Sequence, residues 1–331
     1  MTHTAASDGG PHRLQPLRSA ARPRTPHTAA ARAAAALPRR EPQLRPARVG
    51  TGSVRAPADP GARVGGAALT EFAPVARHPW EWPLAAAAAA VTACLLAAVI
   101  HTLLTGEGAA VWAAGLVLAG VPAGCWAEGG LQHAKQRAQS VRISPTQFPE
   151  AHHAIRRLSA QMGLACAPDA YVHPAADRPR SWAAGHGRRG YVVVSGDLFD
   201  SGGRLRDPDA LRFVVAHQLG HIAAGHTALW LRAATAAGRA VPVLGASLSR
   251  AMEYTADNHA HAHCPEGVHA IRMLAGGAHL YAQVNMSEMA ERARTDRGPF
   301  LLLYNLLSSR PANTKRMAAL RDRTRPGRVF L

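Results

Sequence analysis

The sequence contains few cysteines, few acidic residues and few aromatic residues. Its four cysteines, Cys94, Cys125, Cys166 and Cys264, form no Cys-x-x-Cys pair, so the sequence indicates neither a disulfide framework nor a thiolate zinc site. This distribution fits a reducing compartment. Lys and Arg together number 38 against 21 Asp and Glu, which gives a formal net charge of +17. A chain this basic can interact with nucleic acid or with an anionic membrane surface.

Residues 1–78 have a composition that argues against a folded core. This segment is rich in Ala, Arg, Pro and Gly, so it cannot bury enough apolar area to offset the entropy lost on ordering. We expect a disordered, solvated basic tail that is retained in the mature protein, because the first apolar run begins only at Pro83. Since the tail lacks interleaved aromatic residues, a protein that tethers nucleic acid is the weakest functional hypothesis, and no specific nucleic-acid partner is expected.

Two long apolar runs follow, covering residues 83–104 and 109–127. Each is close to the ~20 residues that a helix needs to cross the hydrocarbon layer of a bilayer. Amphipathic indoles favour the membrane interface, and four tryptophans lie near the ends of these runs: Trp80, Trp82, Trp112 and Trp126. We therefore expect a transmembrane helical hairpin. The alternative is a buried helical hairpin within a soluble domain, because Ala-rich runs are less apolar than Leu-rich ones.

Basic residues on both flanks of these runs predict an orientation. Arg77 and His78 precede the first run, and several basic residues follow the second: His133, Lys135, Arg137 and Arg142. The positive-inside rule then places both termini and the C-terminal domain in the cytoplasm. We expect a multi-pass protein of the plasma membrane, with the lipid bilayer as one partner.

Residues 140–325 indicate one mixed domain with a helical majority. Pro149 begins a helix that Gly163 closes, while residues 170–173 and 191–195 are short β-prone runs with a turn at 188–190 before the second. Asp207 followed by Pro208 is typical of a helix N-terminus, and the apolar residues after it recur at helical spacing.

That last helix contains the run His217-Gln218-Leu219-Gly220-His221. Histidines four residues apart project from one face of a helix and can bind one metal ion. Further along the chain, Glu253 and Asp257 lie one helical turn apart. Glu253 is the candidate third ligand, and Asp257 can accept the spare N–H of a ligating histidine and fix its tautomer.

These segments together resemble the HtpX and CAAX-prenyl-peptidase family of membrane zinc peptidases. The resemblance includes residues 213–221, the Arg250, Glu253, Ala256 and Asp257 pattern, and residues 309–320, which are similar to a C-terminal Ser-His-Pro motif; in all it covers residues 77–320. It implies an α+β, mostly helical, zincin-like metallopeptidase domain preceded by the transmembrane hairpin. It also implies one zinc ion held by His217, His221 and Glu253, and a protein or peptide substrate.

Two positions depart from the family pattern. Gln218 replaces the glutamate that acts as general base, and a carboxamide can orient water but cannot accept its proton. General-base help is typically worth ~10²–10⁴ in rate. Arg310 replaces the histidine of the C-terminal motif, although an arginine can still donate to an oxyanion. The first hypothesis is therefore a membrane-bound zinc metalloendopeptidase acting on membrane or misfolded proteins with weak or absent activity. The alternative is a pseudopeptidase that serves as a zinc-containing binding or regulatory membrane protein.

Other polar or apolar clusters are predicted to be structural. His226 follows His221 by five residues, a spacing that on a helix turns its side chain away from the metal-binding face, so we interpret it as a packed or capping residue. His259, His261 and His263, followed by Cys264, form a run that we expect to be solvated. Residues 300–307 are apolar but too short to cross a bilayer, and we expect a core helix. The connection between His221 and Glu253 is too short, and too interrupted by Arg232 and Arg239, for a second transmembrane hairpin.

Overall fold

The computed structural model describes residues 75–330, apart from 175–180, 187–188 and 201. All of these residues lie in the unit Ala68–Leu331. The predicted disordered tail therefore lies outside the described residues as far as residue 74. The predicted tail included His78, but this residue is only 3% exposed and its ring stacks on Tyr254 with the centroids 5.5 Å apart. The folded part thus begins before residue 78.

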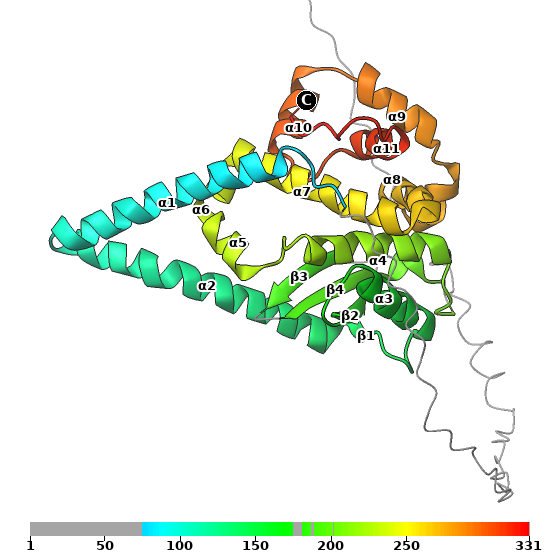
Figure 1. Ribbon diagram of the computed structural model, residues 1–331, viewed down its shortest axis with the longest axis horizontal. Coiled ribbons are helices and arrows are strands. Elements are labelled where there is room, and N and C mark those ends of the chain that lie inside the picture. The colour runs from blue at the N-terminus through cyan, green and yellow to red at the C-terminus, as the bar shows by residue number, and fades with distance from the viewer. Residues whose placement is uncertain (1–74, 175–180, 187–188, 201, 331) are drawn as a thin grey trace, which may run out of the picture. The chain divides into compact units, whose positions relative to one another are not determined.

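The described part is mostly helical and contains one small sheet (Figure 1). The α-helices are α1 (Glu81–Thr105), α2 (Ala109–Gln139), α3 (Pro149–Gln161), α4 (Pro208–Ala223), α5 (Leu229–Ala234), α6 (Ala236–Ala240), α7 (Pro242–His263), α8 (Met273–Leu280), α9 (Met286–Thr295), α10 (Pro299–Leu307) and α11 (Asn313–Arg321). Short 3-10 helices are η2 (Gly196–Leu198), η3 (Pro265–Arg272) and η4 (Tyr281–Gln283). The strands are β1 (Val141–Arg142), β2 (Asp169–His173), β3 (Trp182–His186) and β4 (Arg189–Ser195).

Helices α1 and α2 meet at a tight turn and diverge from it, with α5 and α6 lying between them in the view of Figure 1. Within the described residues, only these two helices are long and apolar enough to cross a membrane. Only 17% of the most apolar stretch of α1 and 6% of that of α2 are buried, so most of their apolar side chains are not covered by the rest of the described chain. This exposure argues against a hairpin buried in a soluble domain.

The second apolar helix is longer than the predicted span of residues 109–127, because α2 continues to Gln139. The extension is polar and contacts the sheet: the ring of His133 stacks on Tyr191 with the centroids 4.8 Å apart. The same α-helix therefore has an apolar exposed part and a polar part that packs on the domain.

The sheet has the strand order β1-β2-β4-β3, in which β2 and β4 are parallel and both outer pairs are antiparallel. Strands β2 and β4 confirm the two β-prone runs, and Val172 pairs with Val194 in their register. Residues 187–188, where part of the turn was predicted, lie outside the described residues. Strand β3 was not predicted, because its sequence Trp-Ala-Ala-Gly-His contains no β-branched residue.

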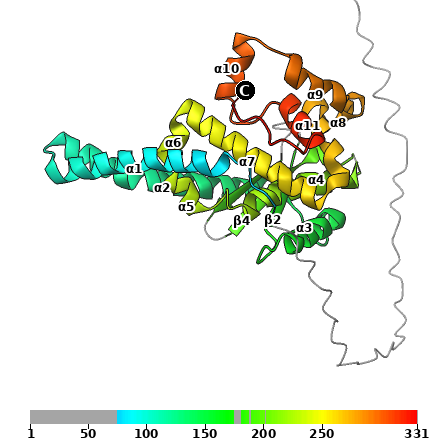
Figure 2. The same ribbon diagram turned by 45° about the horizontal axis from the view of Figure 1, so that its top comes forward.

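Helix α4 lies at the centre of the domain, where it contacts α7 on one side and strands β3 and β4 on the other, as Figures 1 and 2 show. Its predicted apolar face is buried, since Leu211, Val215 and Leu219 have no exposed surface. Helix α3 packs on α4 as well, and its bounds confirm the helix predicted from Pro149. The helix that carries the candidate metal ligands is thus held on several sides.

Helix α10 does not pack as the core helix that we expected. The exposed fraction is 85% for Phe300 and 51% for Leu303, and among the residues of the helix only Asn305 is buried. The prediction failed because the sequence of a short apolar run shows that its side chains are hydrophobic but does not show which other segment of the chain covers them.

Candidate metal centre and cleft

Local sequence fixes the start of α4. The Asp207 side chain accepts hydrogen bonds from the backbone N–H groups of Asp209 and Ala210, at 3.1 and 3.0 Å, and Pro208 occupies the first helical turn. The Asp207 Oδ2 atom also lies 2.6 Å from His269 Nε2 on η3. These contacts confirm the predicted cap and fix the N-terminal end of α4 against η3.

Gly220, between the two histidines, permits the close approach of α4 and α7. A Cβ atom at this position would lie 2.7 Å from the His259 Cβ atom and 3.3 Å from the Ala256 carbonyl oxygen of α7. Any larger residue would push the two helices apart. The close packing brings Glu253, on α7, opposite the histidines of α4.

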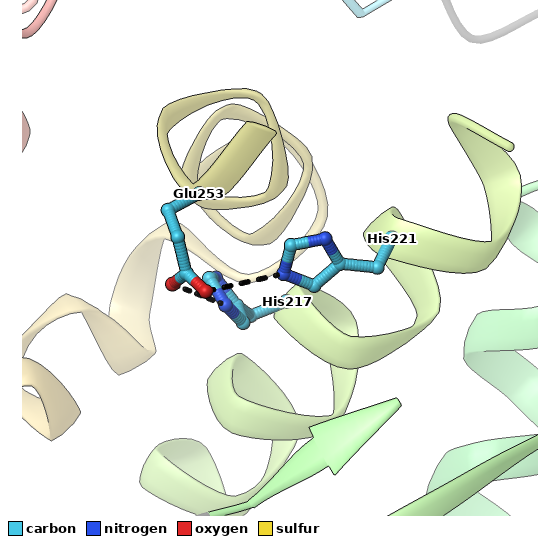
Figure 3. A group of neighbouring side chains, drawn as sticks. All are labelled: His217, His221 and Glu253. Atoms are coloured by element: carbon cyan, nitrogen blue, oxygen red, sulfur yellow. Dashed lines mark ion pairs between the residues drawn. The ribbon is translucent and has the colours of Figure 1, made fainter. Parts of the chain in front are cut away.

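His217, His221 and Glu253 point toward one another from these two helices (Figure 3). His217 Nε2 lies 3.5 Å from Glu253 Oε2, and His221 Nε2 lies 3.8 Å from Glu253 Oε1. One donor atom from each residue lies within 4.8 Å of the others, and within the described residues this is the group of His, Cys, Asp and Glu side chains that can hold a metal ion. The structure thus brings together the three predicted ligands.

Asp257 and Arg316 lie behind this group. Asp257 Oδ1 is 2.9 Å from His217 Nδ1, the position expected of a residue that fixes the histidine tautomer. Arg316, on α11, donates to both carboxylate oxygens of Asp257, and its Nη1 atom lies 3.6 Å from Glu253 Oε2. The sequence placed Arg316 only within a C-terminal motif and gave it no role. Its side chain in fact completes a buried network of two carboxylates, a histidine and a guanidinium.

The electrostatics of this network favour an ionised Glu253 and a neutral His221. Although burial alone raises the pKa of Glu253, the hydrogen bond with His217 and the charge of Arg316 hold it well below its usual value. Burial, with the nearby charge of His217, lowers the pKa of His221 to about 3. Burial also acts to lower the pKa of His217, but hydrogen bonds with Asp257 and Glu253 raise it overall.

His226 contacts His221, contrary to the expectation that its side chain turns away. The two Nδ1 atoms are 2.8 Å apart, and His226 Nε2 lies 3.1 Å from Glu81 Oε1. The spacing argument assumed a continuous helix, but α4 ends at Ala223 and Gly225 has a φ of +76°, which turns the chain back toward His221. His226 is packed, as predicted, but it packs on a candidate ligand.

One set of ring tautomers satisfies this chain of contacts. If Glu81 accepts from His226 Nε2–H, then His226 Nδ1 is free to accept from His221 Nδ1–H, which leaves the lone pair of His221 Nε2 toward Glu253. Glu81 is only 2% exposed and is also hydrogen bonded by Arg77 and Thr255. The first turn of the apolar helix α1 thereby supports the candidate metal centre. The sequence did not indicate this role, because Glu81 only precedes an apolar run.

The candidate ligands line a cleft of about 240 Å³ that extends from β3 and β4 to α8. Gln218 lies in this cleft and its Nε2 atom donates to the Ser181 carbonyl oxygen at 3.3 Å. Arg310, whose side chain is 39% exposed, lies at the cleft surface with Nε 3.9 Å from Glu253 Oε1. Both residues that depart from the family pattern are therefore next to the candidate ligands.

The histidine run at the end of α7 is less solvated than we expected. His259, His261 and His263 are each partly buried, and Cys264 is only 2% exposed. Burial lowers the pKa of His259 to about 4. The expectation failed because α7 continues through His263, so that His259 and His263 lie one helical turn apart and their rings stack with the centroids 6.3 Å apart.

Comparison with known proteins gives one match. The family model of peptidase family M48 matches residues 145–237 and 229–324, which together cover more than half of the chain and include every residue of the metal-ligand group. No curated protein and no solved structure matches the chain.

Proposed function

Because the chain belongs to peptidase family M48, we propose that it is a membrane-bound, zinc metalloendopeptidase-like protein whose peptide hydrolysis is weak or absent. The observation that carries the proposal is the group of His217, His221 and Glu253, with Gln218 beside it. The finer assignment to an HtpX-like or CAAX-prenyl-peptidase-like subgroup is part of the same proposal.

The donor set fits zinc. Two imidazole nitrogens and one carboxylate oxygen leave a fourth position open, as in catalytic zinc sites. Donor atoms on one tetrahedral ion with bonds of ~2.1 Å lie ~3.5 Å apart. One donor atom from each of the three residues lies within 4.8 Å of the others, so the group is compact enough to hold one ion. A zinc ion held there supplies Lewis-acid activation of a carbonyl group and of water. Asp257 and His226 hold the two histidine rings in the orientation that such binding requires.

Gln218 limits what this site can do to a peptide bond. Its carboxamide can hydrogen bond to water or to a ligand but cannot take up a proton, so the chain lacks a general base at this position. The remaining residues can still bind and orient a peptide, and Arg310 can donate to an oxygen that develops negative charge. We therefore propose binding of a membrane or misfolded protein segment with little turnover.

The bond from Gln218 to the Ser181 carbonyl oxygen favours the alternative of a pseudopeptidase. A carboxylate at position 218 has no hydrogen to donate and would face the carbonyl oxygen without a bond, whereas the amide satisfies it. The contact supports a site in which glutamine is structurally accommodated. Under this alternative the protein is a zinc-containing binding or regulatory membrane protein.

The exposed helices α1 and α2 support the membrane part of the proposal. Large apolar side chains cover their surface, with exposed fractions of 80% for Leu104, 76% for Trp112 and 73% for Leu116. Water contact at this many neighbouring apolar residues is unfavourable, and a bilayer removes it. The positive-inside rule then supports the plasma membrane with both termini and the peptidase-like domain in the cytoplasm.

The first experiment compares the purified protein with the Gln218→Glu variant. We expect one bound zinc per chain by elemental analysis, no casein cleavage by the natural protein, and chelator-sensitive cleavage by the variant. If both forms bind zinc and neither cleaves casein, the result would instead favour the pseudopeptidase. Absence of zinc, or zinc that persists in His217→Ala, would contradict the metal site, and chelator-sensitive cleavage by the natural protein would contradict the predicted inactivity.

A further inference from the structure

Arg239, on α6, is a cation of the cleft that has no acidic partner among the described residues. Its Nη2 atom makes one hydrogen bond, to the Met252 sulfur at 3.6 Å. A thioether sulfur is a weak acceptor, and it carries no charge that compensates a guanidinium. Every other cation of the cleft lining faces a carboxylate, because Arg310 and Arg316 both lie within 4.0 Å of Glu253.

The acidic side chains of the cleft do not provide a partner for Arg239. Glu253 faces the two histidines, and Asp197 accepts a hydrogen bond from Ser195 on the side of the sheet. Burial lowers the pKa of Arg239, and the charge of Arg232, which is another cation, lowers it further. A partly buried guanidinium with only a cation nearby is unfavourable unless an anion comes from elsewhere.

The backbone holds Arg239 in this place. Gly238 packs against α1 so closely that a Cβ atom there would lie 2.3 Å from the Ala88 Cα atom, and the Ala237 N–H donates to Thr92 Oγ1 at 3.2 Å. On the other side, Gly245 of α7 lies against the Arg239 carbonyl group. Helix α6 is therefore packed closely on both α1 and α7, and the Arg239 side chain is directed at Met252, the residue that precedes Glu253.

We propose that Arg239 is an anion-binding subsite of the cleft. The ligand is a peptide segment that has an Asp or Glu side chain next to the peptide group that faces the metal ligands. This assignment rests on the proposed function, because it takes peptide as the occupant of the cleft. A guanidinium binds a carboxylate through two parallel N–H···O bonds. The neutral Gln218 adds no negative charge that would repel such a segment. A peptide is favoured over a lipid headgroup because Arg239 lines the same cleft as His217 and His221.

The test uses the zinc-loaded, full-length protein in detergent and a series of fluorescein-labelled peptides. Each peptide carries a single Glu at a different position, and each has a control peptide with Gln at that position. Fluorescence polarisation should find one position at which the Glu peptide binds about tenfold more tightly, since a charge-assisted bond contributes ~1.5 kcal/mol. Arg239→Gln should abolish this preference and leave the affinity for the Gln peptide unchanged, whereas Arg239→Lys should keep part of it. Arg321→Gln, an exposed change outside the cleft lining, is the matched control and should keep all of it.

The outcomes separate this assignment from the function on which it rests. Zinc-dependent peptide binding with no preference at any position, or a preference that persists in Arg239→Gln, would overturn the subsite alone. No peptide binding with or without zinc would overturn both. If Arg239→Gln instead weakens sedimentation with phosphatidylserine vesicles and leaves peptide binding unchanged, the anion is a lipid headgroup and the peptide assignment is wrong. Zinc content and melting temperature equal to those of the natural protein establish that Arg239→Gln is folded.

Discussion

The α1–α2 pair and the α4–α7 pair distribute their side chains in opposite ways. The first pair presents leucines and tryptophans on its outside, whereas the second buries charged groups, with exposed fractions of 1% for Arg250, 2% for Asp257 and 8% for Glu253. The first arrangement suits a helix pair surrounded by lipid, and the second suits a polar site whose buried charges compensate one another. Glu81 links the polar site to the first helix pair, because it begins α1 and hydrogen bonds with His226 and Thr255.

The largest expected effect comes from breaking the buried charges of the second pair. Arg316→Met removes the guanidinium that faces Asp257 and Glu253, and leaves two uncompensated carboxylates in the interior. Loss of one partner from a buried network costs about 3–5 kcal/mol. Chemical unfolding of the detergent-solubilised protein should measure this loss, and Arg321→Met, an exposed change on the same helix, should cost almost nothing. Equal stability of the two variants would show that the network does not hold the domain together.

A charge placed on the first pair tests whether lipid surrounds it. Leu116→Lys puts an ammonium group in the apolar part of α2, where insertion should become less favourable by about 2.5–3.5 kcal/mol. The control is Leu131→Lys, which is similarly exposed (71%) but lies in the polar extension of the same helix. We expect only Leu116→Lys to reduce the fraction that stays in the membrane after alkaline carbonate extraction. An equal response of both variants would mean that α2 is not inserted.

The residue shared by the two regions should affect metal binding. Glu81→Gln weakens the acceptor that fixes His226, and through it His221, so zinc affinity should fall about 10–100-fold, the usual effect of a residue that orients a ligand. Competition with a chromophoric chelator measures this affinity. Glu107→Gln, an exposed change in the turn of the same helix pair, should leave it unchanged. Unchanged affinity in Glu81→Gln would show that the two regions are independent.

The smallest expected effect concerns the cap that orients α4. Asp207→Ala should reduce the free energy of unfolding by about 1 kcal/mol at neutral pH, because two backbone N–H groups lose their acceptor. Burial alone would raise the pKa of Asp207, but the bond from Ala210 and the contact with His269 lower it. Because the pKa is lowered in the folded state, the stabilising contribution of Asp207 is fully present above the unfolded-state pKa. It is lost as the pH falls through the folded-state pKa. The difference between Asp207→Ala and the natural protein should therefore shrink at acid pH, and a constant difference would contradict the assignment.

The local features of the fold could largely be read from the sequence. The start of α4 follows from Asp207 and Pro208, strands β2 and β4 follow from short β-prone runs, and the two apolar helices follow from their length. The predictions for α10 and His226 failed for different reasons. For α10, the sequence of the segment does not show whether another part of the chain covers it. For His226, the spacing argument assumed a continuous helix, whereas α4 ends at Ala223 and Gly225 turns the chain back toward His221.

The sequence by itself determined the family, because His217, His221, Glu253 and Asp257 have spacings that are set within single helices. The tertiary structure alone decided that Glu81, Arg239 and Arg316 surround them. These three residues come from α1, α6 and α11, and no local spacing predicts contacts between such distant segments. Their positions follow from close helix packing at Gly220 and Gly238, where the absence of a side chain lets backbones approach and brings charged groups into one low-dielectric site.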